Sequence, residues 1–278
     1  TVAIIKKSTA AVNALRIAKR KYSEYLLQIT KGMKSLDDKL YSNNHGNNVR
    51  KIRRDFPQPA ISAECKSCPL DPVELFSKNS GRHILEKHLQ MMDVSSKDQK
   101  LFIEFGVLLG GSCKRWLSVS DTFHILAIDH WPAEPLTVIH GLLDDPKTKG
   151  SLSHLSQEQV NQLLNNLEKY GFQQYLINCC LNPNRFTIAR AKLPDILFYL
   201  YDRKIYPNVM YFDADKDWNS IEIALKLFPC TTICGDDYLW KSEGIENMIP
   251  TKLHEFSQEK AFNLEVSGNT WILKRKKI

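Results

Sequence analysis

Short apolar runs alternate with amphipathic segments from residue 97 onward. Each apolar run has the length of a buried strand, and each amphipathic segment has the spacing of a helix. The expected strands are 101–105, 124–128, 185–189, 208–212 and 231–234, followed by a hairpin of 262–266 and 270–274. The expected helices are 112–119, 156–170, 173–180, 195–203, 218–227 and 252–260. This alternation predicts an α/β fold with a mostly parallel sheet and one antiparallel strand.

Two segments interrupt this pattern. Residues 41–62 begin with a polar, Asn-rich stretch and contain Pro57 and Pro59, which is typical of a linker. Residues 132–155 contain several prolines and glycines, so we expect a long loop there. Because long loops inside compact domains are usually functional or mobile, this loop is a candidate lid over a binding site.

The N-terminal segment has a period of its own. Over residues 8–40, apolar residues recur every seven positions, at Leu15, Tyr22, Ile29 and Leu36. The repeat predicts a helix that lies on its own domain, pairs with a second copy in a homodimer, or binds nucleic acid or acidic lipid. We therefore divide the chain into a basic helical extension with its linker (1–60), a helical lead-in (61–96) and the α/β domain (97–278).

Charge and composition narrow the class of protein. The net charge is +7, and residues 1–60 alone carry thirteen Lys and Arg against four Asp and Glu. The positive surplus belongs to the N-terminal segment, so nucleic acid is a weak candidate partner for the α/β domain. No apolar run reaches the roughly 18 residues of a membrane span. The seven cysteines form no regular framework, which favours a reducing, cytoplasmic location.

A candidate zinc site precedes the α/β domain. Cys65, Cys68, His83 and His88 have a spacing close to that of zinc-finger ligands. The interval between the cysteines and the histidines is long, however, and two prolines fall early in it. Free thiols with histidines on a helix surface are the alternative, and the sequence leaves both interpretations open.

Several expected strands end in residues that can hold a nucleotide. The first strand contains Glu104 and runs into a turn of Gly106 and Gly110-Gly111-Ser112, where the backbone N–H groups are open to a ligand. Asp129 follows the second strand, where a carboxylate can accept hydrogen bonds from ribose hydroxyls or cap a helix. Further carboxylates follow later strands, at Asp213, Asp215, Asp236 and Asp237. Because parallel strands end at one rim, we expect these groups to converge there.

These motifs resemble those of a known enzyme family. They read EFGVLLGGS at 104–112, IDHW at 128–131, DADKDW at 213–218, GDDY at 235–238 and SGNTW at 267–271. Over residues 101–274 the chain resembles class I S-adenosylmethionine-dependent methyltransferases, in particular the metal-dependent sugar and macrolide O-methyltransferases. The resemblance implies a Rossmann-like sheet and S-adenosylmethionine as cofactor. The cofactor-binding residues that it implies are Glu104, Gly106, Gly110, Gly111, Ser112, Asp129, His130, Trp131 and Asp213.

The resemblance also implies a metal ion and a base. The counterparts of Asp213, Asp236 and Asp237 hold Mg²⁺ in the metal-dependent members, and carboxylate oxygens are the ligands that Mg²⁺ prefers. The counterpart of Asp215 is a candidate base. The family has His where this chain has Lys216. If that His is the family's base, catalysis in this chain is either impaired or uses Asp215 or Lys216 as the base. Because clustered carboxylates repel one another, a cation is expected among them, which Mg²⁺ or the lysine can supply. Strand-end caps and structural hydrogen bonds are the alternative roles for the metal-site aspartates.

Three functions are compatible with these features. The leading hypothesis is an O-methyltransferase that acts on a sugar or another small hydroxylated acceptor, because both the cofactor residues and the carboxylate set are present. The alternatives are a nucleic-acid methyltransferase that uses the basic N-terminal segment and a non-catalytic scaffold that keeps the fold. The sequence carries no signature that names the acceptor.

Overall fold

The structure is a computed structural model. It describes residues 45–64, 71–74, 80–94, 99–144, 152–179, 181–214, 217–240, 247–259 and 262–276. The helix expected over 8–40, with its candidate role in a homodimer, lies outside the described residues. Cys65, Cys68, Asp215 and Lys216 lie outside them as well.

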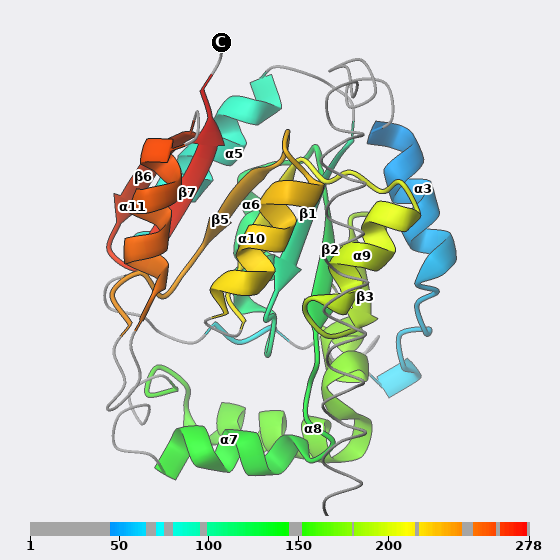
Figure 1. Cartoon of the computed structure of the whole chain (residues 1–278). Coiled ribbons are helices and arrows are strands. Elements are labelled where there is room, and N and C mark those ends of the chain that lie inside the picture. The colour runs from blue at the N-terminus through cyan, green and yellow to red at the C-terminus, as the bar shows by residue number, and fades with distance from the viewer. Residues whose placement is uncertain are drawn as a thin grey trace, which may run out of the picture. The chain divides into compact units, whose positions relative to one another are not determined.

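The core of the fold is a seven-stranded sheet in the order β3-β2-β1-β4-β5-β7-β6 (Figure 1). The strands are β1 (Lys100–Phe105), β2 (Phe123–Asp129), β3 (Phe186–Arg190), β4 (Val209–Phe212), β5 (Thr232–Gly235), β6 (Phe262–Ser267) and β7 (Thr270–Arg275). Strands β1 to β5 pair in parallel, and β7 runs antiparallel to both β5 and β6. The predicted fold class, a mostly parallel sheet with one antiparallel strand, is confirmed.

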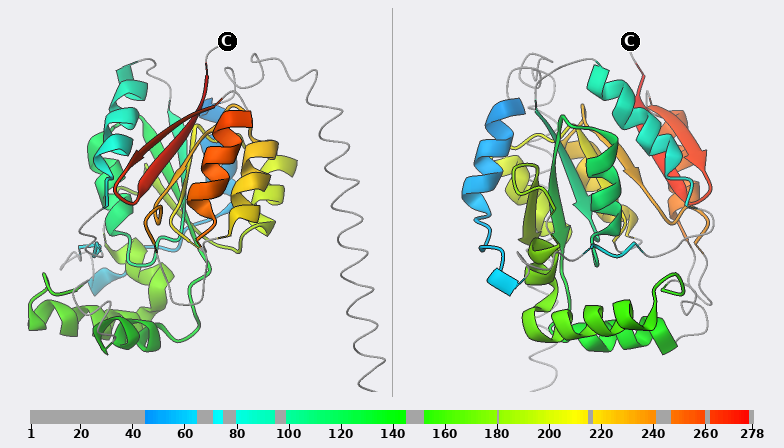
Figure 2. Two further views of the ribbon diagram at one scale, coloured as in Figure 1. Left: turned by 60° about the vertical axis from the view of Figure 1, so that its left-hand side comes forward. Right: turned by 180° about the vertical axis from the view of Figure 1, so that it is seen from behind.

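Helices cover both faces of the sheet. They are α3 (His45–Asp55), α5 (His83–Val94), α6 (Gly111–Val119), α7 (Pro135–Asp144), α8 (Gln157–Asn178), α9 (Asp195–Asp202), α10 (Trp218–Leu227) and α11 (Ile249–Glu259). Figure 2 shows α5 and α6 on one face, and α10 and α11 on the other. Because both faces are covered, the central strands are buried on both sides, which explains their continuous apolar sequences.

Aromatic side chains fill the space between the sheet and α6. Trp116 of α6 lies against Tyr211 of β4, with ring centroids 5.4 Å apart, and Phe102 of β1 packs beside both. All three side chains are fully buried. Burying the Phe102 side chain stabilises the fold by about 1.5–3 kcal/mol, whereas Trp116 and Tyr211 also bury an N–H and a hydroxyl that have no hydrogen-bond partner among the described residues. This packing holds α6 against β1 and β4, whose carboxyl ends border the candidate site.

Helix α8 follows the sequence closely. Ser156 caps its start, because its hydroxyl accepts from the Gln159 N–H at 3.2 Å and the Gln159 side chain accepts from the Ser156 N–H at 2.8 Å. The helix is interrupted at Gly171, whose φ of 71° and ψ of 173° are not helical. The sequence predicted a break at this point, between a helix over 156–170 and another over 173–180.

Two expectations about irregular segments were wrong. Residues 132–155 were expected to be irregular, but Pro135–Asp144 form α7, which packs against α8 beyond the carboxyl ends of the parallel strands (Figure 1). Proline is favoured in the first turn of a helix, where its missing N–H has no partner to lose, and Ile139 of α7 is fully buried. The prolines of this segment therefore include one that starts a helix.

The expected linker over 41–62 contains α3. Val49 and Ile52 of this helix are buried, and this apolar face outweighs the polar, Asn-rich composition. The basic residues of α3 bind the chain itself: the Lys51 ammonium donates to the Lys204 carbonyl at 2.9 Å, and Arg53 donates to the Asn184 carbonyl. Among the residues described, no helix is long and apolar enough to cross a membrane.

Candidate functional site

The candidate site lies where β1, β2, β4 and β5 end side by side. The sheet register pairs Phe105 at the end of β1 with Ile128 of β2 and with Phe212 of β4, and Phe212 in turn pairs with Gly235 of β5. The residues that follow these strands are therefore neighbours on one rim. This placement agrees with the predicted convergence of Gly106, Asp129, Asp213 and Asp236.

Gly106 makes the first turn of the site possible. Its φ is 86°, and a Cβ atom at this position would lie only 2.2 Å from the carbonyl oxygen of Asp213. Its N–H donates to the Ile128 carbonyl at 2.9 Å. A side chain at this position would both strain the backbone and push β1 and β4 apart, so the turn requires glycine.

Asp129 is held firmly at the end of β2. Its Oδ2 accepts from the Leu108 N–H at 2.8 Å, and its Oδ1 accepts from the Trp131 N–H at 3.0 Å. The indole of Trp131 also donates to the Leu108 carbonyl at 3.2 Å. These bonds fix the carboxylate between two loops, so Asp129 does not act as a helix cap here. Each oxygen keeps a further lone pair that can accept from a ligand hydroxyl.

A pocket of about 400 Å³ opens beside this carboxylate. Apolar side chains line part of it, among them Leu108, Ile128 and Leu193. Its polar lining includes Asp129, His130 and Lys192. An apolar wall for a base and a carboxylate for ribose hydroxyls are the two features that a nucleoside needs. The residues present therefore fit the adenosine part of S-adenosylmethionine.

A smaller pocket of about 120 Å³ adjoins the first. It shares Gly106, Leu108 and Asp213 with the nucleoside pocket. Its charged lining consists of Glu74, Arg82 and Asp213. This mixture of carboxylates and a guanidinium suits a ligand that carries both an ammonium and a carboxylate group, as the methionine part of the cofactor does.

Glu104 joins β1 to α6 beneath this pocket. It is fully buried, and it accepts from the hydroxyl of Ser112 and, at 3.0 Å, from the thiol of Cys113. Burial raises the pKa of Glu104 to about 7, although the two hydrogen bonds and Arg82 oppose the shift. In the described structure these contacts tie the strand to the start of α6.

The start of α6 is covered by an earlier part of the chain. The Gly111 N–H donates to the Val73 carbonyl, and the Val73 N–H donates to the Leu109 carbonyl, both at 3.2 Å. The sequence suggested that ligand atoms approach the N–H groups of this turn. At Gly111 the carbonyl of Val73 takes that position, so an anion there would have to displace the segment 71–74.

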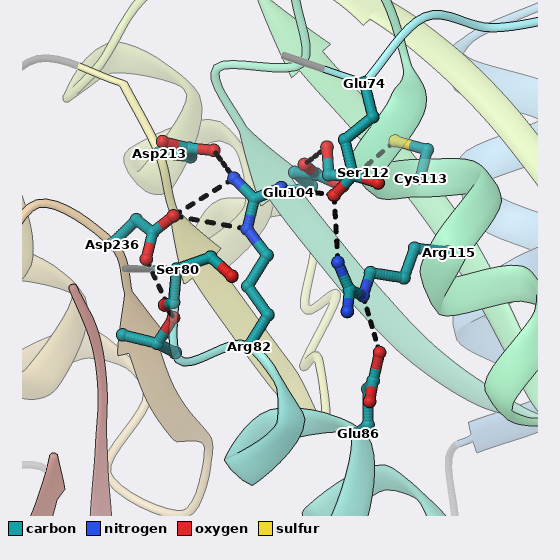
Figure 3. A network of polar contacts seen from close by, with 11 residues as sticks. Glu74, Ser80, Arg82, Glu86, Glu104, Ser112, Cys113, Arg115, Asp213 and Asp236 are labelled. Carbon is teal, nitrogen blue, oxygen red and sulfur yellow. Dashed lines mark hydrogen bonds and ion pairs between the residues drawn. The ribbon is translucent and has the colours of Figure 1, made fainter. Parts of the chain in front are cut away.

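Asp213 and Asp236 face the side chain of Arg82 (Figure 3). The Nη2 atom of Arg82 lies 3.0 Å from Oδ2 of Asp213 and 3.0 Å from Oδ2 of Asp236, and its Nε donates to the same Asp236 oxygen at 3.2 Å. Burial raises the pKa of both carboxyl groups, and the positive charge of Arg82 opposes that shift. Arg82 is thus the positive charge that favours the ionised form of both carboxyl groups against the effect of burial.

A metal ion does not fit between these two carboxylates as they are placed. Within the described ranges, no group of three or more His, Cys, Asp and Glu side chains is arranged to hold a metal ion. The third expected ligand, Asp237, has a φ of 67°, and its carbonyl accepts from the Trp240 N–H at 3.0 Å. A Mg²⁺ ion would need oxygen atoms at about 2.1 Å, in space that the guanidinium of Arg82 takes.

Sequence reasoning missed Arg82. It was placed in the helical lead-in, and its partners Asp213 and Asp236 follow it by 131 and 154 positions. The one signal is indirect: clustered carboxylates require a cation, and the sequence predicts Mg²⁺ or Lys216 for that role.

The histidines of the candidate zinc site lie on α5. His83 is exposed, whereas the ring of His88 is half-buried, and its Nε2 lies 3.3 Å from the hydroxyl of Thr232. Burial and nearby Lys274 lower the pKa of His88 to about 4. Their proposed partners Cys65 and Cys68 are outside the described residues, so the zinc site stays a prediction.

Neither family models nor the sequences of curated proteins match this chain. Solved structures with a related arrangement include an O-methyltransferase from Bacillus cereus in complex with SAH, with 18% identity, 81% of this chain and 95% of that chain covered, and a TM-score of 0.39. A precorrin-6y C5,15-methyltransferase from Geobacter metallireducens has 12% identity, coverage of 72% and 91%, and a TM-score of 0.37. A SAM-dependent O-methyltransferase from Thermotoga maritima has 13% identity, coverage of 70% and 66%, and a TM-score of 0.34. The similarity is low throughout, so the argument for function rests on the site.

Proposed function

We propose that this chain is an S-adenosylmethionine-dependent O-methyltransferase that acts on a sugar or another small hydroxylated acceptor. The observation that carries the proposal is the Asp129 carboxylate, held by two backbone N–H groups beside a pocket of nucleoside size. A strand-end carboxylate in this position accepts hydrogen bonds from the two ribose hydroxyls of a nucleoside. The motifs at 104–112, 128–131, 213–218 and 235–238 select the methyltransferases among nucleoside-binding folds.

The two adjoining pockets suit the two parts of the cofactor. We place its adenosine in the larger pocket, against Leu108 and Ile128, with Asp129 on the ribose. We place its methionine part in the smaller pocket. There Asp213 can accept a hydrogen bond from the ammonium group of the cofactor, and Arg82 can donate to the cofactor's carboxylate. When bound, S-adenosylmethionine supplies a methyl group activated by the positive sulfonium.

The acceptor hydroxyl must lose its proton as its oxygen takes the methyl group. The base that we propose is Asp215, with Lys216 as the alternative, because they come two and three positions after Asp213 in the sequence. The products are a methyl ether and S-adenosylhomocysteine. Alignment and exclusion of water are the main remaining requirements for methyl transfer.

Calorimetric titration of S-adenosylmethionine tests the proposal. Wild type should bind, and Asp129→Ala should lose at least about tenfold in affinity, which corresponds to ~1.4 kcal/mol. The matched control is Asp121→Ala, which removes a fully exposed carboxylate near the opposite end of β2 and should bind as wild type does. Absence of binding to wild type, or equal binding to Asp129→Ala, would overturn the proposal. If wild type binds S-adenosylmethionine and Asp129→Ala does not, sugar acceptors can be screened by release of S-adenosylhomocysteine.

A further inference from the structure

Arg82 is surrounded by three carboxylates. Besides Asp213 and Asp236, it reaches Glu74, whose Oε1 accepts from Nη1 of Arg82 at 2.9 Å. The Arg82 side chain is only 8% exposed, and that of Asp236 is 7% exposed. The guanidinium and the carboxylates depend on one another in this buried position, because either charge alone would be costly to bury.

The network continues to a second arginine. The same oxygen of Glu74 accepts from Nη1 of Arg115 at 3.0 Å, and Arg115 also pairs with Glu86 (Figure 3). Arg115 is more exposed than Arg82, and its two acidic partners come from outside the strand-end rim. It therefore neutralises Glu74 without touching Asp213 or Asp236, which makes it a natural comparison for Arg82.

The backbone before Arg82 is anchored to the far edge of the sheet. Gly81 has a φ of 65°, and a Cβ atom there would lie 1.6 Å from the carbonyl oxygen of Ser267, at the end of β6. Next to it, the Thr270 hydroxyl of β7 contacts the Ser80 carbonyl. The β6–β7 hairpin thus fixes the segment 80–82, and this contact directs the guanidinium to the ends of β4 and β5.

We propose that Arg82 takes the place of the divalent metal ion, so that this site works with a resident guanidinium and without a bound metal. Asp213 and Asp236 are the first and second carboxylates of the expected metal set, and the guanidinium bridges them. Arg82 places a positive charge between the two carboxyl groups, and its N–H groups donate to the oxygen atoms that a metal ion would otherwise bind. For a metal to enter, the guanidinium of Arg82 would have to leave Asp213 and Asp236, and it would lose two of its three carboxylate partners.

Arg82 therefore balances the charge of Asp213 and Asp236, in addition to its proposed contact with the carboxylate of the cofactor. The claim that methyl transfer needs no metal rests on the proposed function. The claim that Arg82 and a metal compete for the same carboxylates does not, because this competition needs neither cofactor nor acceptor. The two claims can fail separately.

The decisive experiment measures Mn²⁺ binding to the full chain by calorimetry and by the electron paramagnetic resonance signal of free Mn²⁺. Mn²⁺ binds to carboxylate sites as Mg²⁺ does, and its resonance reports occupancy directly. Wild type should bind no Mn²⁺ at this site. Arg82→Ala should gain one Mn²⁺ site and a rise in melting temperature with Mn²⁺. The matched control Arg115→Ala should gain neither.

A further variant assigns the new site. Arg82→Ala combined with Asp213→Asn should lose the gained Mn²⁺ binding, because one of the two bridging carboxylates is then neutral. Arg82→Lys keeps a cation in place and should resemble wild type, which covers the case in which Arg82→Ala fails to fold. Mn²⁺ binding to wild type that Asp213→Asn abolishes would overturn the proposal, and so would tight Mn²⁺ binding to Arg82→Lys.

Turnover offers an independent readout once an acceptor is found. Wild-type activity should be unchanged by a chelator, and added Mg²⁺ should give no increase. Loss of activity in chelator with recovery on Mg²⁺ would overturn the inference while leaving the proposed methyltransferase function intact. Absence of cofactor binding would instead remove the proposed function and leave the cation result standing.

Discussion

The hydroxyl of Thr270 donates a hydrogen bond of 2.8 Å to Oδ1 of Asp236. Thr270 begins the antiparallel strand β7 and is fully buried, and Asp236 follows β5, which pairs with β7. The other oxygen of Asp236 accepts from Arg82. Both oxygens of this carboxylate are thus occupied by groups that come from distant parts of the chain, and the hairpin helps to orient the site.

Thr270→Val should destabilise the protein by about 1–3 kcal/mol, because at nearly constant side-chain volume it removes the hydroxyl that contacts both the Asp236 carboxylate and the Ser80 carbonyl. Urea unfolding followed by circular dichroism measures the change. Thr251→Val, on the exposed side of α11, is the control and should shift the free energy of unfolding by less than about 0.5 kcal/mol. Equal effects of the two variants would show that the bond to Asp236 contributes nothing.

Glu104→Gln should change how stability depends on pH. Burial raises the pKa of Glu104 from 4.5 to about 7, so the folded protein binds a proton that the unfolded chain releases. The resulting stabilisation is complete below pH 4.5 and is lost as pH rises to about 7, on the order of 3 kcal/mol in all. The difference in the free energy of unfolding between wild type and Glu104→Gln should therefore change by that amount across this range, in favour of the variant as pH rises. Glu168→Gln, at an exposed position of α8, should keep the wild-type profile.

His88→Gln should act in the opposite direction. Burial and Lys274 lower the pKa of His88 from 6.5 to about 4, so the unfolded chain takes up a proton that the folded protein does not. The His88 side chain should therefore contribute a loss of about 1–3 kcal/mol of stability as pH falls from 6.5 to 4, opposite in sign to the contribution of Glu104. In His88→Gln this acid-dependent loss should be smaller by that amount. His83→Gln, an exposed change on the same helix, should leave it as in wild type.

Gly106→Ala should weaken both the fold and cofactor binding, since its Cβ would lie 2.2 Å from a backbone oxygen of Asp213. We expect a loss of more than about 1 kcal/mol in stability from the positive φ alone, and a weaker affinity for S-adenosylmethionine in calorimetry. Gly141→Ala is the matched control, because nothing lies within 4 Å of its added Cβ in α7. That variant should be neutral or stabilised by up to about 1 kcal/mol, with unchanged binding.

The sequence predicted the elements whose residues carry their own signal. Strands such as Leu101–Phe105 are apolar because both of their faces are covered, and this apolar run is visible in the sequence. The start of α8 is visible as well, because Ser156 and Gln159 form a capping box. Helices α3 and α7 were missed, because Asn-rich and Pro-rich composition indicates loops unless the burial of Ile52 or Ile139 is known. Burial of this kind depends on tertiary contacts that local pattern does not contain.

The site was predicted in the same uneven way. Asp129, Asp213 and Asp236 could be placed on one rim because each follows a parallel strand. Arg82 could not, because its segment reaches the rim only through the β6–β7 hairpin, which follows it by more than 180 positions. The cation that balances the carboxylates was expected on chemical grounds, but its identity required the fold.

The segment 71–74 has a consequence for where this chain can be cut. Val73 forms a bridge to the glycine turn, Arg82 completes the rim, and Leu85 and Leu89 of α5 are fully buried. A fragment that starts at residue 97 would retain every strand of the sheet. It would lack one wall of the smaller pocket, the charge that balances Asp213 and Asp236, and the helix that shields an apolar part of the sheet. The smallest piece that folds and binds as the whole does must therefore begin upstream of Asp71.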